Sequence, residues 1–428
     1  MDEAVTRLRG SARKALLGAA LAVLCGLVAA PLSISQQENP QPSGAQLPSP
    51  PPPAQNAVQN GSLHTPPPAS AYAGDAACAE CHEAEARTYA DTTHKGDSSV
   101  ATQKTILGNF TPGQNVLRTS NPNLIFAMIA APDGFYQGAV DIQNPQNLTG
   151  RAEKFDIVVG SGRRGQTYLY WKNDELFELP VTYWTETHEW INSPGYVDGG
   201  VHFNRPIYPR CLECHATTFQ TAPPPANKYL KASLVLGIGC EKCHGPGAEH
   251  VRRERGPHPP LAGSPDIAIV NPARLSRDRA MDVCALCHAG AGVPLTASQS
   301  YRPGDDLAKY LAIAIPPEDV PVDVHGNQVQ ALERSKCFTS GKLTCATCHN
   351  VHKSQESADS FSVHCLTCHT VQACGRFKQL GESIRTRCIE CHMPMGRSQA
   401  LTSESEGKLF RAHLRAHRIA IYPDAGQG

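Results

Sequence analysis

Hydrophobic and polar positions follow several distinct patterns along the chain, and each pattern predicts a different element. Residues 155–159 and 167–171 alternate between the two kinds of residue, which is typical of half-buried strands. Residues 176–181 follow after a short polar stretch, so the last two segments together predict a hairpin. Residues 76–95 are dominated by Ala, Glu and Arg and favour a helix. We expect another helix at residues 406–418.

These patterns predict a domain at residues 75–420 that is mainly α and rich in loops, followed by a short tail at residues 421–428. Within it we expect a small β-rich insertion at residues 150–205, which contains all three Trp of the chain. Only 6% of the residues are aromatic, so side chains alone supply little material for the core of such a domain.

The N-terminal part of the chain predicts an export segment followed by a linker. Residues 1–14 carry four basic side chains ahead of an apolar run at residues 15–30, a combination typical of export signals. The run is short for a membrane-spanning helix, so residues 1–35 are either a signal peptide or an inner-membrane anchor. Residues 36–74 are rich in Pro, Gln, Ala and Ser and predict an extended, disordered linker.

The sequence C-x-x-C-H occurs seven times and uses fourteen of the seventeen cysteines. Two thiols at this spacing can form thioether bonds with the vinyl groups of one haem, and the His that follows ligates its iron. Zinc sites and disulfide redox pairs also use C-x-x-C, but neither needs a His directly after every pair. We therefore expect seven covalently bound haem c groups, which would also supply the missing core material.

The motifs assign the haem-binding residues individually. The cysteines expected to attach haem are Cys78, Cys81, Cys211, Cys214, Cys240, Cys243, Cys284, Cys287, Cys345, Cys348, Cys365, Cys368, Cys388 and Cys391. The histidines expected to ligate iron from the proximal side are His82, His215, His244, His288, His349, His369 and His392. The predicted export agrees with this chemistry, because covalent haem attachment takes place outside the cytoplasmic membrane.

Other histidines are candidates for the distal side of the irons. His250 follows His244 by six residues and cannot reach the opposite face of the same haem, so we expect it to ligate a neighbouring haem. His94 would lie about 18 Å beyond His82 along a helix, which indicates the same arrangement. The eleven histidines left after the proximal ones are enough to give every haem two imidazoles. The candidates for distal ligands are His94, His250, His325, His352, His417, His364 and His202.

Two cysteines of the predicted domain, Cys337 and Cys374, lie outside the motifs. They could pair in an oxidising compartment, where a disulfide would stabilise the fold by roughly 3–4 kcal/mol in the chain-entropy model. Two independent free thiols are the alternative. The net charge of zero gives no reason to expect a nucleic-acid partner.

Three segments resemble those of the multihaem cytochromes c. Residues 240–250 read C-E-x-C-H-G-P-G-x-x-H, residues 344–352 read T-C-x-x-C-H-x-x-H, and residues 388–394 read C-x-x-C-H-M-P. The superfamily that we mean includes the tetrahaem electron carriers of nitrifying bacteria, pentahaem nitrite reductase and hydroxylamine oxidoreductase. The resemblance covers roughly residues 76–420.

The resemblance implies a mostly helical, loop-rich domain with closely packed haems that are largely ligated by two histidines. Carried over position by position, it implies distal ligands at His94, His250, His352 and His417, with His325 as a further one. Pentahaem nitrite reductases usually bind their catalytic haem through Lys, whereas every motif here ends in His. This difference favours electron transfer over catalysis.

The expected function is therefore that of an exported heptahaem c-type cytochrome. It would carry electrons between membrane donors, such as quinol-oxidising or other cytochromes, and periplasmic or extracellular acceptors. An oxidoreductase for a small nitrogen or sulfur compound at one five-coordinate haem is one alternative. A subunit of a conducting cytochrome filament is another.

Overall fold

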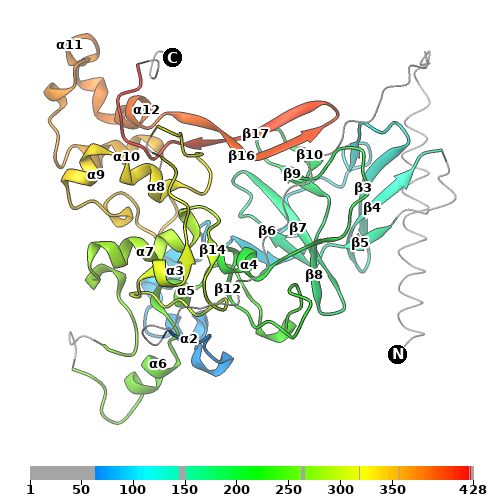
Figure 1. The fold of residues 1–428 in the computed structure, drawn as a ribbon, viewed down its shortest axis with the longest axis horizontal. Coiled ribbons are helices and arrows are strands. Elements are labelled where there is room, and N and C mark those ends of the chain that lie inside the picture. Colours follow the sequence, from blue (N-terminus) through cyan, green and yellow to red (C-terminus); the bar gives the residue numbers. More distant parts are fainter. Residues whose placement is uncertain are drawn as a thin grey trace.

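The computed structural model describes residues 63–143, 151–261, 266–317, 319–355, 357–423 and 425. The expected export segment and most of the linker lie outside these residues. Figure 1 shows a β lobe, formed mainly by residues 98–206, beside a helical lobe that contains most of the other described residues except 395–415. Part of the segment after residue 206 still packs on the β lobe, because Phe219 and Tyr229 are buried in one cluster with Leu176. Within the described part of the chain, no helix has both the length and the apolar character that crossing a bilayer requires.

The expectation of a mainly α fold is wrong, because the protein is 27% helical and 23% strand. Strands begin at Ser98, well ahead of the insertion expected at residues 150–205. The reason lies in residues 124–141, where apolar and aromatic side chains pair across a turn at Pro132 and Asp133 into a long hairpin. Helices stay short because one attachment motif occupies little more than a single helical turn.

Two antiparallel sheets make up the β lobe. The seven-stranded sheet contains β1 (Ser98–Val100), β6 (Ile157–Val159), β7 (Gly165–Lys172), β8 (Glu175–Glu178) and β11 (Arg205–Pro206), with β9 (Val181–Trp184) and β10 (Glu189–Asn192) branching from β7. The four-stranded sheet contains β2 (Val116–Arg118), β3 (Leu124–Ala131), β4 (Gly134–Asp141) and β5 (Ala152–Lys154).

The structure confirms the predicted hairpin as β7 and β8. Asn173 lies in the two-residue loop between them with a φ of 55°, as a tight hairpin turn requires. The second strand is shorter than predicted and ends at Glu178, and the chain resumes as β9 only at Val181. Pro180 stands between the two and cannot donate a ladder hydrogen bond.

The β lobe has a hydrophobic core of its own that consists largely of aromatic side chains. Phe155 and Tyr168 stack with their ring centroids 4.3 Å apart, and Trp190 packs edge-on against Tyr183 at 5.1 Å. Phe126 from the four-stranded sheet is buried in the same cluster. Burial of each such side chain contributes about 1.5–3 kcal/mol, so this core does not depend on a cofactor.

The helical lobe is built from short helices and connecting loops. Its α-helices are α2 (Asp75–Ala79), α3 (Glu83–Tyr89), α4 (Pro209–His215), α5 (Cys240–His244), α6 (Ala248–Glu254), α7 (Arg277–His288), α8 (Gln328–Glu333), α9 (Lys336–Ser340), α10 (Ala358–Cys365), α11 (Phe377–Leu380) and α12 (Cys388–His392). Its 3-10 helices are η1 (Ala69–Ala71), η2 (Lys231–Ser233), η3 (Pro272–Arg274), η4 (Leu307–Lys309), η5 (Cys345–Thr347), η6 (Val371–Ala373) and η7 (Gly381–Thr386). Its strands are β12 (Ala216–Thr218), β13 (Val235–Leu236), β14 (Val293–Pro294) and β15 (Leu311–Ala312).

The helix predicted at residues 76–95 is divided and shorter than expected. The chain leaves helical geometry at His82, where φ is −109° and ψ is 44°, so α2 and α3 are separate. Beyond Tyr89 the chain forms consecutive turns rather than more helix. These turns carry His94 away from the axis of α3.

The helix expected at residues 406–418 is wrong, because this segment forms a strand. β16 (Met395–Ser405) and β17 (Lys408–Arg415) make an antiparallel hairpin whose turn residues, Glu406 and Gly407, have φ values of 52° and 71°. Such a turn matches the twist of a two-residue hairpin. Its far end packs on the β lobe, where the Ser403 hydroxyl donates to the carbonyl of Asn192 at 2.6 Å (Figure 1).

The described end of the predicted linker packs against the helical lobe. The backbone N–H groups of Ala73 and Gly74 donate to the carboxylate of Glu241 at 2.8 and 2.9 Å. The backbone N–H of His64 donates to the Tyr310 hydroxyl at 3.4 Å. Residues on the N-terminal side of the predicted boundary at residue 75 thus contact the helical lobe.

We predict that Phe155→Ala lowers the free energy of unfolding of the β lobe by about 3–5 kcal/mol, because it leaves a cavity in the aromatic core. Urea unfolding followed by far-ultraviolet circular dichroism measures the effect. Val197→Ala is the control, since Val197 is 72% exposed and its truncation should change stability little. Equal losses in the two variants would contradict a separate core in the β lobe.

Candidate haem-binding site

The attachment motifs all lie on helical turns. Four of them end α4, α5, α7 and α12. In the other three the backbone N–H of the His donates to the carbonyl of the first Cys, at 2.9 Å for His82, 3.0 Å for His349 and 2.9 Å for His369. Positions i, i+3 and i+4 share one face of such a turn. Each motif therefore presents two thiols and one imidazole on the same side.

Five of these turns surround one large cavity of about 2080 Å³, which exceeds the usual range of about 300–1,000 Å³ for the pocket of a single small ligand. The motifs that line it begin at Cys78, Cys211, Cys240, Cys284 and Cys345. The sixth and seventh motifs lie outside its lining. The cavity thus has room for several macrocycles attached to its walls.

Four predicted distal histidines face a proximal histidine of another motif. Two imidazoles that ligate one metal from opposite sides, each with a metal–nitrogen distance of about 2 Å, have ring centroids about 6 Å apart. The ring centroids lie 6.4 Å apart for His82 and His250, 6.1 Å for His288 and His94, 6.0 Å for His244 and His352, and 6.2 Å for His349 and His417. Each pair therefore has the separation that a single iron between them requires.

A fifth predicted distal residue, His325, also lines the cavity. Burial lowers its pKa, Asp323 opposes that shift, and the nearby His215 lowers the pKa further, which places His325 close to the second motif. Asp323 also fixes the loop, because its carboxylate accepts from the backbone N–H of His325 at 2.8 Å and from the Ser398 hydroxyl at 2.7 Å. The hairpin residue Ser398 thereby helps to position this imidazole.

Four of the eight facing imidazoles have a lowered pKa, which favours the neutral form that binds a metal. Burial is the main cause that lowers the pKa of His94, His244 and His288, and it lowers that of His417 to about 4. His215 differs, because burial would lower its pKa but the hydrogen bond and the charge of Asp97 raise it.

Hydrogen bonds to Nδ1 leave Nε2 of these rings free to ligate a metal. A backbone carbonyl or a carboxylate can only accept, so the ring nitrogen that contacts it carries the proton. The acceptors are Asp97 for His215 at 2.8 Å, Val270 for His244 at 2.8 Å, Ala420 for His392 at 2.8 Å, Asp266 for His250 at 2.5 Å and Arg415 for His417 at 3.1 Å. The side-chain amide oxygen of Gln355 lies 2.8 Å from Nδ1 of His349.

These partners of the imidazoles are functional residues that sequence reasoning missed. Asp97 lies three residues after His94, and Asp266 lies sixteen residues after His250. Neither position has a motif that marks it. Their role becomes visible only where the fold brings each carboxylate to a ring nitrogen.

Thiols of different motifs also lie side by side. Contacts join Cys78 to Cys240, Cys214 to Cys287, Cys284 to Cys345 and Cys365 to Cys388. The contact with Cys287 lowers the pKa of the Cys214 thiol to about 6, which is the effect expected of two thiols that share a proton. The motifs are therefore packed against one another rather than distributed over the lobe.

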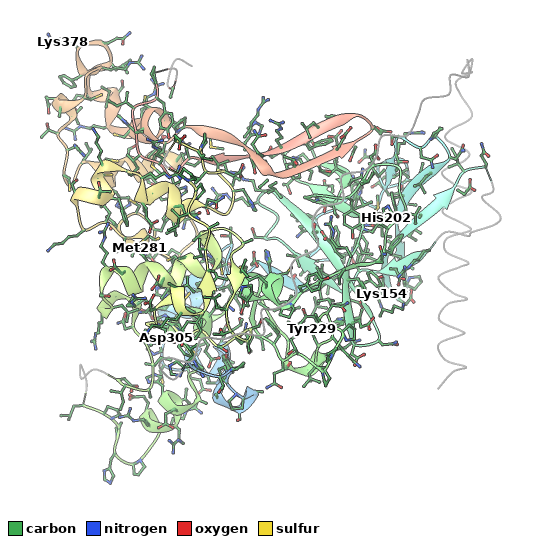
Figure 2. All side chains as sticks on the ribbon, viewed as in Figure 1. Lys154, His202, Tyr229, Met281, Asp305 and Lys378 are labelled. Atoms are coloured by element: carbon green, nitrogen blue, oxygen red, sulfur yellow. The ribbon has the colours of Figure 1, made fainter. Side chains whose placement is uncertain are left out.

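Some predicted site residues lie elsewhere. Figure 2 shows His202 among the strands of the β lobe, where the adjoining Phe203 is buried against Phe126, and His202 is not part of the cavity lining. His364 is exposed on α10, with its ring 6.4 Å from that of Phe361. Cys337 and Cys374 are both free thiols, so the structure does not contain the predicted disulfide.

Two apolar side chains on the cavity wall test the fit of a haem. Leu261 is 83% exposed and Ile267 is 91% exposed, although both line the cavity. Single exposed aliphatic side chains are common on protein surfaces, but those that lie together at a cavity mark a place where an apolar group binds. A flat apolar macrocycle attached to the neighbouring motifs would cover them, so the residues present fit the group that the motifs imply.

Several helical turns each present two thiols and one imidazole to the same cavity, and a second imidazole lies opposite the first. This arrangement is that of a multihaem c-type cytochrome. Its cofactor is covalently bound haem c. Comparisons with known proteins agree. Residues 186–245, which include the second and third motifs, match the family described as cytochrome c554 and c-prime.

Individual relatives are other multihaem cytochromes. The C-type polyheme cytochrome OmcC of Geobacter sulfurreducens is 34% identical over 99 residues, which are 22% of this chain and 11% of that protein. The outer cell wall cytochrome OcwA has a similar fold, with a TM-score of 0.50 and 15% identity over 82% of this chain and 79% of OcwA. An undecaheme cytochrome from the S-layer of Carboxydothermus ferrireducens gives a TM-score of 0.36 at 17% identity, over 77% of this chain and 52% of that one.

We predict that the double variant Cys284→Ser/Cys287→Ser loses one covalently bound haem, because serine hydroxyls do not form thioether bonds. The mass of the intact purified protein, together with the pyridine haemochrome spectrum, measures the loss. Cys337→Ser is the matched control, since Cys337 lies outside the motifs and its replacement should leave the haem content unchanged. If the mass of the double variant still included every haem of the unmodified protein, Cys284 and Cys287 would not be haem-attachment residues.

Proposed function

We propose that this protein is an exported heptahaem cytochrome that transfers electrons between membrane donors and periplasmic or extracellular acceptors. The observation that carries the proposal is the meeting of proximal and distal histidines across the cavity, at ring separations of 6.0–6.4 Å. An iron with two imidazoles has no open position for a substrate. Such a centre is suited to electron transfer rather than to substrate chemistry.

For four haems the ligand assignment follows from these meetings, and for the second haem it follows from the place of His325 in the same cavity lining as His215. We assign His250 to the haem of the first motif, His325 to the second, His352 to the third, His94 to the fourth and His417 to the fifth. Each distal imidazole comes from a segment other than the one that holds the haem covalently. Coordination would therefore cross-link distant parts of the chain as well as complete the metal site.

Haem supplies an iron that takes up and releases one electron. The cysteines of each motif would hold one such group covalently, and the assigned histidines would provide two imidazoles to five of the groups. Two imidazoles also give a lower reduction potential than one imidazole and one thioether, which suits a protein that receives electrons from low-potential donors.

The contacts between attachment turns support a continuous series of centres. The pKa of the Cys284 thiol is raised by the adjacent Cys345, by burial and by Cys243, so the third, fourth and fifth motifs adjoin one another. Burial, Cys388 and Cys348 raise the pKa of Cys365 to about 11, which links the fifth, sixth and seventh motifs. The first motif adjoins the third, and the second adjoins the fourth. All seven turns are thereby connected.

A location outside the cytoplasm fits both the export pattern of residues 1–35 and the covalent attachment of haem. An N-terminal anchor would keep the protein near quinol-oxidising or other cytochromes of the inner membrane. OcwA, whose fold is similar, is an outer cell wall cytochrome. Extracellular electron transfer is thus a fitting role for this chain as well.

A second candidate function rests on the sixth and seventh motifs. Within the described residues, no ring pair joins His369 or His392 to another imidazole. A five-coordinate haem at either position would bind a small molecule. This observation favours an oxidoreductase for a small nitrogen or sulfur compound as the alternative.

Electron paramagnetic resonance of the oxidised protein, with haem quantified by pyridine haemochrome, separates the two functions. We expect seven haems, of which at least five give low-spin signals because two imidazoles create a strong ligand field. Low-spin signals from all seven would support the electron carrier. A high-spin signal that nitrite or hydroxylamine perturbs would support the oxidoreductase, and fewer than five low-spin haems would contradict the ligand assignment.

We also predict that His250→Met raises the midpoint potential of one haem, because a thioether ligand stabilises the reduced iron more than an imidazole does. A spectroelectrochemical titration of the full-length protein measures the shift. His258→Met is the control, since His258 lies exposed in a loop outside the cavity lining. An unchanged titration of the His250 variant would remove it from the set of ligands.

A further inference from the structure

The hydrogen-bond partners of the ligating imidazoles fall into two chemical groups. His244, His392 and His417 donate Nδ1–H to uncharged backbone carbonyls, and His349 contacts the amide oxygen of Gln355. His215 and His250 instead donate to carboxylates, at 2.8 Å to Asp97 and 2.5 Å to Asp266. Two of the assigned ligands thus differ from the others in the charge of their partner.

The carboxylate of Asp266 is held in place by further contacts. Its side chain is 13% exposed, and its other oxygen accepts from Arg253 and from the backbone N–H of Ala268, both at 2.8 Å. The side chain of Asp97 is 24% exposed. Its backbone is positioned by the hydrogen bond that its carbonyl accepts from the N–H of Gly160 at 2.6 Å.

An imidazole that donates to a carboxylate is a stronger electron donor than one that donates to a carbonyl, because the partial shift of the proton leaves negative charge on the ring. A stronger donor stabilises the oxidised iron relative to the reduced iron. The partner of the ligand is therefore one of the means by which a protein sets a haem potential.

We propose that Asp97 and Asp266 are redox-tuning residues, which lower the midpoint potentials of the haems of the second and first motifs respectively. The inference rests on the proposed haem ligation. Arg253 neutralises part of the charge on Asp266, so the effect of Asp97 is the larger of the two. The two haems with lowered potentials belong to the first and second motifs. Electrons would therefore flow from these two haems toward haems of higher potential in the other motifs.

The variants Asp97→Asn and Asp266→Asn test the inference in the full-length holoprotein. Each keeps the shape of the side chain and an oxygen that can accept from Nδ1–H, but it removes the charge. We expect one component of the spectroelectrochemical titration to shift to higher potential in each variant. A tenfold change in the ratio of oxidised to reduced haem at a fixed potential, which is about 59 mV, is the expected order of magnitude.

Three further variants separate tuning from a merely structural role. Gln355→Glu adds a carboxylate beside His349. It should lower the midpoint potential of one haem, whereas the Asp→Asn variants should raise one. Glu186→Gln removes a carboxylate that contacts His413 at 3.2 Å, a histidine to which we assign no iron, and should shift no component. Asp97→Glu keeps the negative charge, so its spectroelectrochemical titration should be the same as that of the unmodified protein.

The outcomes distinguish this inference from the proposed function. Seven haems with unchanged low-spin signals and one raised component per variant would support tuning, and the component raised by Asp266→Asn must be the one that His250→Met raises. Unchanged potentials, or shifts spread evenly over all components, would overturn the tuning while leaving the ligation intact. A loss of low-spin haem in the Asp→Asn variants would show that the carboxylates only position the ligands. Fewer than seven haems in the unmodified protein would contradict the proposed function instead.

Discussion

The helical lobe is arranged around pairs of imidazoles that face each other at ring separations of 6.0–6.4 Å. The chain forms only short helices there, and their turns would not hold together on the strength of their own hydrogen bonds. Each imidazole pair joins segments that are far apart in sequence, as His82 and His250 do. With the proposed ligation, metal coordination and covalent attachment would replace much of the side-chain packing that a domain of this size normally requires.

The β lobe follows the opposite principle, because its aromatic core needs no cofactor. Phe155, Tyr168 and Trp190 pack against one another and are nearly inaccessible to solvent. The hairpin of β16 and β17 connects the two kinds of architecture, since it packs on the β lobe and also fixes Asp323 beside His325. The molecule thus combines one lobe stabilised by its side chains with one organised around its prosthetic groups.

The sequence predicted the chemistry of the site better than it predicted the fold. The attachment motifs are local, because two thiols and an imidazole share one helical turn, so residue spacing alone identifies them. His94, His250, His352 and His417 were likewise identified as candidates, but which motif each one faces depends on tertiary structure. The C-terminal helix is wrong because Glu406 and Gly407 have positive φ values and close a hairpin at the start of the expected helix. Asp97 and Asp266 have no local signature at all.

The pairing of His349 with His417 links one candidate haem site to the other lobe. The thiols and the imidazole of the fifth motif share one helical turn, whereas His417 lies two residues after the end of β17 at Arg415. The ring of His417 lies 6.2 Å from that of His349, and the hairpin that precedes it is packed on the β lobe through Ser403 and Asn192. The geometry of this site is therefore coupled to a contact in the β lobe that is remote from the site itself.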